Sequence, residues 1–156
     1  MGNVMGGCEC KQPEPVYVSM VYTGVLKGTD EAQPIPFDRV LTRYPSNAWD
    51  PENFHFVCPK AGTYMFSFAV RPDLEYAASV HLMRGTEPSV SIFADKNDGN
   101  AGTSSQSTLL DLAAGEKIWV RLDDGPNMGI RSHPKSPTTT FNALLVHPAK
   151  SGKDGN

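Results

Sequence analysis

The chain has 156 residues, of which 39% are hydrophobic and 20% charged, and its formal net charge is −3 at pH 7. A chain of this length is typical of one domain, with enough apolar surface to build a core without disulfides. The slightly acidic balance argues against a nucleic-acid partner. No apolar run approaches the roughly 18–20 residues of a membrane helix, so we expect no membrane insertion.

Composition divides the chain into a domain with two polar tails. We expect an N-terminal tail over residues 1–15, a domain over 16–147 and a C-terminal tail over 148–156. Cys8 and Cys10 in the first tail are separated by one residue, so a bond between them would close a small, strained ring. We predict that they form interchain disulfides in an oxidising compartment; the alternative is two reduced, exposed thiols.

Short runs of β-forming residues, separated by turn residues, predict about ten strands. In chain order they are expected at residues 16–22, 37–42, 54–58, 64–70, 77–83, 89–93, 107–112, 117–122, 128–131 and 138–146. Residues 44–52, which include Trp49, are predicted to form a loop because they are rich in Pro, Asn and Asp. No stretch sustains a helical period of 3.6 residues, so the pattern predicts an all-β sandwich or jelly roll.

The segment 54–70 gives the clearest core pattern. Its large side chains alternate with period two, which places them on one face of each of two strands. In the first strand they are Phe54, Phe56 and Cys58, and in the second Tyr64, Phe66, Phe68 and Val70. Cys58 is therefore predicted to be a buried free thiol that packs as a small hydrophobe. A catalytic role for Cys58 would need an activating base, which no neighbouring motif supplies.

Ordered motifs across residues 35–146 resemble the complement C1q globular-head family. The matching residues are Phe37 and Val40; Phe56, Cys58, Pro59, Gly62, Tyr64, Phe66 and Phe68; Leu110, Leu112, Gly115, Glu116, Ile118, Trp119 and Val120; Phe141, Leu144 and Leu145; and, in a loop, Trp49-Asp-Pro51. Four positions depart from the family pattern, namely Glu116 for Asp, Ile118 for Val, and Asn142 and Ala143 for Ser-Gly.

This resemblance implies a TNF-like jelly roll, here of ten strands, that assembles as a compact homotrimer. It also implies a secreted binding protein. Aromatic residues near the terminal strands would then be available to fill a threefold interface. Our candidates are Tyr17, Tyr22 and Phe141, and for each the alternative is a position in the core of one chain.

The residues themselves show no catalytic constellation. The four histidines, His55, His81, His133 and His147, are dispersed, and His55 and His81 alternate with core residues, which predicts that they face solvent. Nucleophile elbows, phosphate loops and zinc-protease motifs are missing from the sequence. A zinc site is not expected because no second Cys/His pair lies at ligand spacing. We therefore predict that the protein is not an enzyme.

Some members of the family bind calcium at the trimer apex, through the loop that here spans residues 95–102. Calcium prefers carboxylate, amide and carbonyl oxygens, which Asp95, Asn97, Asp98 and Asn100 would supply. The alternative is an ordinary polar turn, because Gly102 stands where calcium-binding relatives have a late aspartate.

A trimer would present three copies of each exposed loop, so weak sites would gain avidity on repeated targets such as cell-surface glycans. The loops are 44–53, 71–77, 95–105 and 123–137. Guanidinium and ammonium groups can bind anionic sugars or carboxylates, and the alternative for each is solvated surface charge. The candidates are Arg71, Arg84, Arg121, Arg131 and Lys135.

These expectations leave three functions open. The first is lectin-like recognition of cell-surface or microbial ligands in innate immunity. The second is a secreted signalling or adhesion ligand of the cerebellin-like or adipokine-like type that clusters a receptor. The Cys8-Glu9-Cys10 motif favours this second function, because cerebellin-like members join trimers through paired N-terminal cysteines. The third is a matrix protein whose trimer is only an assembly head.

Overall fold

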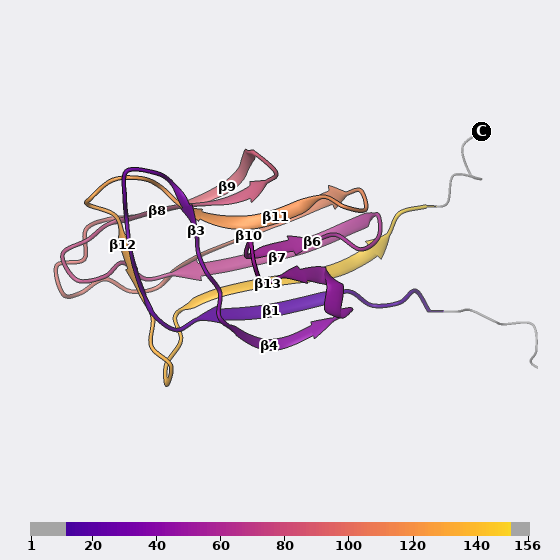
Figure 1. The fold of residues 1–156 in the computed structure, drawn as a ribbon, viewed down its shortest axis with the longest axis horizontal. Coiled ribbons are helices and arrows are strands. Elements are labelled where there is room, and N and C mark those ends of the chain that lie inside the picture. Colours follow the sequence, from indigo (N-terminus) through magenta and orange to yellow (C-terminus); the bar gives the residue numbers. More distant parts are fainter. Residues whose placement is uncertain (1–11, 151–156) are drawn as a thin grey trace, which may run out of the picture.

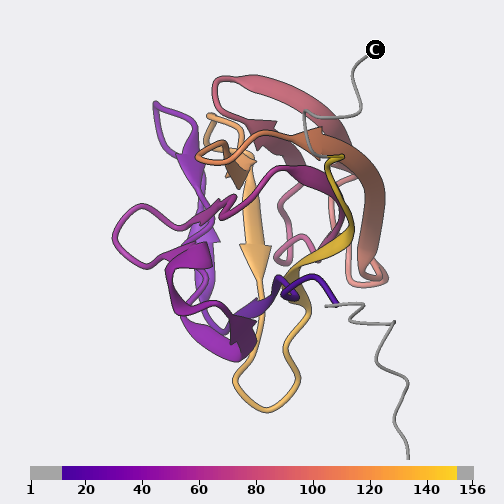
Figure 2. The ribbon, with the colours of Figure 1, turned by 90° about the vertical axis from the view of Figure 1, so that its right-hand side faces the viewer.

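The computed structural model describes residues 12–150, and these form two β-sheets packed face to face (Figures 1 and 2). The predicted disulfides of Cys8 and Cys10 lie outside the described residues. The strands run along the long axis of the molecule. The first strand begins, and the last strand ends, at the right-hand end of Figure 1. Loops form the opposite end, called the loop end below.

The first sheet has five antiparallel strands. In spatial order they are β10 (Ser104–Leu112), β7 (Gly62–Val70), β13 (Thr139–Pro148), β1 (Tyr17–Tyr22) and β4 (Arg39–Tyr44). The terminal strands β1 and β13 pair with each other inside this sheet, so each of them has a hydrogen-bonded neighbour on both sides.

The second sheet has six strands and is joined by a short ribbon at the loop end. Its strands are β5 (Trp49–Asp50), β6 (His55–Val57), β11 (Lys117–Leu122), β8 (Ala78–Arg84) and β9 (Glu87–Ala94), with β3 (Gln33–Pro34) beside β11. The ribbon consists of β2 (Val25–Lys27) and β12 (Gly129–Arg131), and η2 (Ser46–Ala48) is a single 3₁₀ turn. The all-β prediction is therefore confirmed.

The core lies between the two sheets and is built from aromatic rings. Phe56, Tyr64, Phe66 and Phe141 are fully buried, and the ring centroid of Phe66 lies 5.5 Å from that of Phe56 and 6.1 Å from that of Phe141. Edge and tilted contacts at these distances are favourable for aromatic pairs. Cys58 is buried and free, as predicted.

The strand count is thirteen in the described residues rather than ten, because three short strands were missed. These are β2, β3 and β5, each of two or three residues, which is too short to show an alternating pattern. Trp49 lies in β5 and is buried, so its placement in a loop was wrong. Phe54 lies outside β6, with a left-handed φ of 60°, and its N–H donates to the Asp50 carbonyl in a turn.

The three aromatic candidates for a threefold interface fall in different places. Phe141 is fully buried in the core of a single chain, so of its two alternatives the core position is the correct one. The Tyr22 hydroxyl donates to the Val25 carbonyl at 2.9 Å, beside the short ribbon. Tyr17 lies on the outer face of the five-stranded sheet, 6.1 Å from the ring of Tyr44. None of the helical structure in the described residues is long and apolar enough to cross a membrane.

Candidate functional site: the loop end and the outer face of the five-stranded sheet

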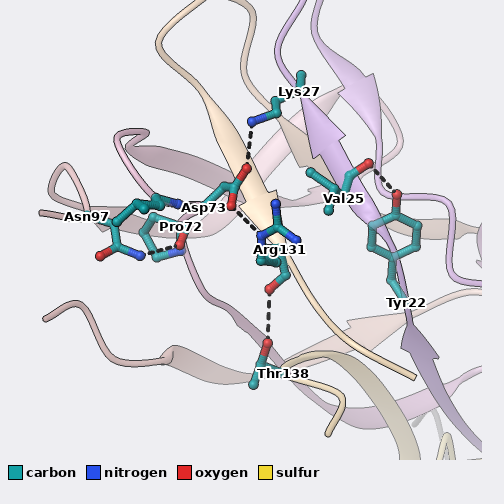
Figure 3. A network of polar contacts seen from close by, with 9 residues as sticks. Tyr22, Val25, Lys27, Pro72, Asp73, Asn97, Arg131 and Thr138 are labelled. Carbon is teal, nitrogen blue, oxygen red and sulfur yellow. Dashed lines mark hydrogen bonds and ion pairs between the residues drawn. The ribbon is translucent and has the colours of Figure 1, made fainter. Parts of the chain in front are cut away.

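A buried carboxylate organises the loop end of the sandwich. Asp73, in the loop between β7 and β8, is only 3% exposed. It accepts hydrogen bonds from Lys27 Nζ at 2.6 Å and Arg131 Nε at 2.5 Å (Figure 3). It also accepts the Leu74 N–H. Burial alone would raise the pKa of this carboxyl, but the bonds from Arg131, Lys27 and Leu74 outweigh burial and lower the pKa to about 2.

Asp73 thereby joins three segments that are far apart in the sequence. Lys27 comes from β2 and Arg131 from β12, and Figure 3 shows the carboxylate lying between their two charged groups. Lys27 Nζ also lies 3.6 Å from the ring centroid of Tyr76, in cation–π contact. The ribbon of β2 and β12 is therefore anchored to the loop that follows β7.

A second anchor, Asn97, joins the loops 71–77 and 95–103. Asn97 is buried, and its Nδ2 donates to the Pro72 carbonyl at 2.8 Å (Figure 3). Its Oδ1 accepts the Gly99 N–H at 2.9 Å. Its backbone exchanges hydrogen bonds with Glu75 and Tyr76. The walls of the loop end are thus fixed by hydrogen bonds before any ligand binds.

Two of the predicted ligand-binding residues meet at this loop end. Pro72 pairs with Ile130 in an antiparallel bridge, and the Arg131 N–H donates to the Arg71 carbonyl at 3.0 Å. Arg71 and Arg131 both line a hollow of about 350 Å³, together with Leu74 and Gly99. The Arg131 side chain is 60% exposed, although its Nε contacts Asp73.

Arg84 and Arg121, by contrast, already have carboxylate partners within the chain. Arg84 binds Glu116 through two parallel hydrogen bonds of 2.9 and 3.0 Å, and these lower the pKa of Glu116. Arg121 Nη2 lies 3.2 Å from Asp123. Lys135 is exposed on the separate loop between β12 and β13, so the structure does not bring it to the Arg71–Arg131 hollow.

Asp123 is the centre of a further polar cluster, which sequence reasoning missed. On the outer face of the six-stranded sheet, it accepts hydrogen bonds from Ser79 Oγ at 2.5 Å and contacts His81 Nε2 at 2.8 Å, while His81 Nδ1 lies 2.6 Å from Ser91 Oγ. Burial would raise the pKa of Asp123, but these bonds outweigh it and lower the pKa. His81 faces outward as predicted, yet its side chain is only 13% exposed because the cluster and Phe93 cover it.

The predicted calcium residues lie beside the same loop end. Asp95, Asp98 and Asn100 line a second hollow of about 380 Å³. The Asn97 side chain is committed to the loop, so only three of the four predicted side chains remain available to an ion. Within residues 12–150, no three His, Cys, Asp or Glu side chains come close enough together to hold a metal ion. Calcium binding stays a prediction that would depend on carbonyl and water oxygens as well.

The outer face of the five-stranded sheet carries an apolar row that crosses all its strands. Strand register places one large side chain from each strand on this line, and we call the line the apolar row. Its members, in order, are Leu109, Met65, Leu144, Tyr17 and Tyr44. Four of them are 39–60% exposed, and Tyr17 is half-buried.

The next outward row on this face is polar. Its members are Ser107, Ser67, Asn142, Ser19 and Thr42. Asn142 connects its neighbours, accepting from Ser19 Oγ at 2.6 Å and donating to Ser67 Oγ at 3.2 Å. The apolar row is therefore a distinct band, bordered by hydrogen-bonded polar residues.

Comparison with known proteins assigns the family. A family model for the C1q domain matches residues 18–146, which is most of the chain. This chain belongs to the C1q-domain family. Caprin-2 of Danio rerio is 35% identical over 119 residues, a region that covers 74% of this chain but only 12% of Caprin-2. This C1q-domain chain thus spans about an eighth of that curated relative.

Solved structures share the fold at low sequence identity. The globular domain of zebrafish complement 1qA has a TM-score of 0.68 and 22% identity, covering 87% of this chain and 100% of that chain. Murine APRIL, at pH 8.5, has a TM-score of 0.62 and 12% identity, covering 85% of this chain and 100% of that one. Eiger TNF from S. frugiperda also has a TM-score of 0.62 and 12% identity, covering 88% of this chain and 95% of that one. The family prediction is confirmed, and the jelly roll is shared with TNF-like proteins.

Proposed function

We propose that this C1q domain assembles as a homotrimer and acts outside the cell as a non-enzymatic, lectin-like protein that recognises cell-surface or microbial glycans. The family match indicates a binding domain and no enzyme family. The observation that carries the assembly is the apolar row, which leaves five large side chains at the surface of one sheet. Contiguous apolar surface of this kind marks an interaction site.

A second and third copy of the chain are the partners that suit the apolar row. Its members come from every strand of the sheet, so a rigid surface rather than a flexible loop presents them. The five side chains of the row are themselves uncharged, so burying them against another copy buries no charge of the row. In a closed threefold assembly, the apolar row of every copy would be buried in the same way.

Sedimentation of a Leu144→Asp variant tests the assembly. The wild-type chain is expected to sediment with the mass of three chains at micromolar concentration under reducing conditions. Leu144→Asp places a charge at the centre of the apolar row and is expected to give single chains. Leu74→Asp is the matched control, since Leu74 is 56% exposed but lies at the loop end; it should remain trimeric. A monomeric wild-type protein, or a trimeric Leu144→Asp variant, would overturn the proposal.

A glycan array tests the recognition half of the proposal. Selective binding of the trimer to particular glycans supports lectin-like function. Binding to no glycan, with capture of a defined cell-surface protein, would instead establish the receptor-clustering alternative.

A further inference from the structure

Arg71 and Arg131 face each other across the antiparallel bridge at the loop end. They flank the bridge of Pro72 and Ile130, and the Arg131 N–H donates to the Arg71 carbonyl. Residues directly opposite in an antiparallel pair send their side chains to the same face, with Cβ atoms about 4.5–5.5 Å apart. Like charges at such positions are destabilising, so the two guanidinium groups would gain from an anion between them.

The acidic side chain beneath them does not remove this excess charge. Asp73 is shared by Arg131 and Lys27, so one carboxylate faces two cations before Arg71 is counted. Within residues 12–150, the Arg71 side chain makes no hydrogen bond or ion pair, and Arg131 uses only its Nε. Lys96 and Glu75 nearby neutralise each other at 3.0 Å. Free N–H groups of both arginines therefore remain for a ligand.

The hollow around the pair suits one compact group with both a charged and an apolar side. Its volume is about 350 Å³, near the lower end of the range for small-molecule sites. Leu74, which is 56% exposed, and Pro72 supply an apolar wall. Gly99 leaves open space, since no atom lies within 4 Å of where a Cβ would be.

We infer that Arg71 and Arg131 form a site for the carboxylate of a terminal acidic sugar, an inference that rests on the proposed glycan recognition. A planar guanidinium binds a carboxylate through two parallel hydrogen bonds, and the apolar wall would meet the C–H face of the ring. The hollow is too small for an extended peptide. The acidic Asp95 and Asp98 in the neighbouring hollow disfavour a polyanion that runs along the surface.

Binding of sialyllactose and of lactose to the full chain tests this site, because the two sugars differ by one carboxylate-bearing residue. The wild-type trimer is expected to bind sialyllactose and to ignore lactose. Arg71→Gln should weaken sialyllactose binding about tenfold to a hundredfold, the loss of a charge-assisted pair. Arg71→Lys keeps the positive charge but loses the planar guanidinium, so this variant should keep part of the sialyllactose binding that Arg71→Gln loses. Lys117→Gln, at the far end of β11, is the matched control and should bind normally.

The outcomes separate this site from the proposed function. If a trimer binds neutral glycans and Arg71→Gln changes nothing, the carboxylate site is wrong while the lectin function stands. If the wild-type chain is monomeric or binds no glycan, the proposed function itself fails. Arg71-dependent binding of polyglutamate or inorganic sulfate, without binding of sialyllactose, would overturn the assignment to a sugar. Because the Arg71 side chain makes no hydrogen bond or ion pair within residues 12–150, Arg71→Gln is expected to fold, and sedimentation checks this.

Discussion

The buried Asp73 carboxylate should make the stability of the domain depend on pH in a defined window. Its pKa falls from an ordinary value of 3.8 to about 2 in the folded chain. A depression of that size corresponds to about 2–3 kcal/mol of stability, at roughly 1.4 kcal/mol per pH unit. Asp73→Asn keeps the shape of the side chain and removes the charge, so it should lower the free energy of unfolding by about this amount at pH 7.

The sign follows from the direction of the pKa change. A carboxyl with a lowered pKa binds protons more readily in the unfolded chain than in the folded one. The stabilisation by Asp73 is therefore complete above about pH 4 and is lost as the pH falls toward 2. Urea unfolding of wild type and Asp73→Asn from pH 7 to pH 2, at one fixed protein concentration, should show two curves that converge at acidic pH.

Asp30→Asn is the control, because Asp30 is exposed and its side chain makes no hydrogen bond or ion pair within residues 12–150. It should unfold like wild type at pH 7. The reasoning is refuted if Asp73→Asn is as stable as wild type at pH 7. It is equally refuted if the gap between the two proteins stays constant down to pH 2, since the effect would then come from packing rather than charge.

Three further predictions concern the core, the cysteines and the calcium loop. Phe66→Ala should cost about 3–5 kcal/mol in urea unfolding, because the ring is fully buried among aromatics, and unchanged stability would contradict the strand register. The double variant Cys8→Ser/Cys10→Ser should lose disulfide-linked bands on non-reducing gels. Bands that persist in this variant would implicate Cys58, the thiol whose pKa is raised by burial. Millimolar calcium should raise the melting temperature of wild type but not of Asp95→Ala/Asp98→Ala, and identical wild-type curves in calcium and chelator would mean an ordinary turn.

The parts of the fold that sequence could predict are those in which burial follows the strand period. Tyr64, Phe66 and Phe68 alternate in the sequence and are all buried, because one face of β7 packs against the second sheet. Phe54 continues the same alternation but lies in a turn with positive φ, so its spacing misled the strand assignment. For Phe141 the sequence left the core and a chain-to-chain interface open, since a large aromatic side chain suits either place; the structure puts the ring in the core.

The site was less predictable because it depends on contacts between distant segments. Arg71 and Arg131 were predicted as binding residues only because they are charged. They lie opposite each other because Pro72 pairs with Ile130, 58 residues further along the chain, and Arg131 also binds Asp73. Nothing in the local sequence marks Asp73 as buried, because its two partners lie on β2 and β12. Arg84 and Arg121 look the same in sequence, yet each has a carboxylate partner: the pairing of β8 with β11 brings Glu116 to Arg84, and Asp123, two residues along the chain, lies beside Arg121.

The positions of the apolar row and the arginine pair would allow the proposed assembly and the proposed sugar binding to coexist. Tyr17 begins β1 and Met65 lies early in β7, so the row is nearer the end at which β1 begins and β13 ends. Arg71 follows the last residue of β7 and therefore lies at the opposite end. Rotation about a threefold axis along the strands would bury three copies of the row and leave three arginine pairs facing the same way. Each pair alone would bind a single sugar weakly, and a surface that repeats the sugar would be held by avidity.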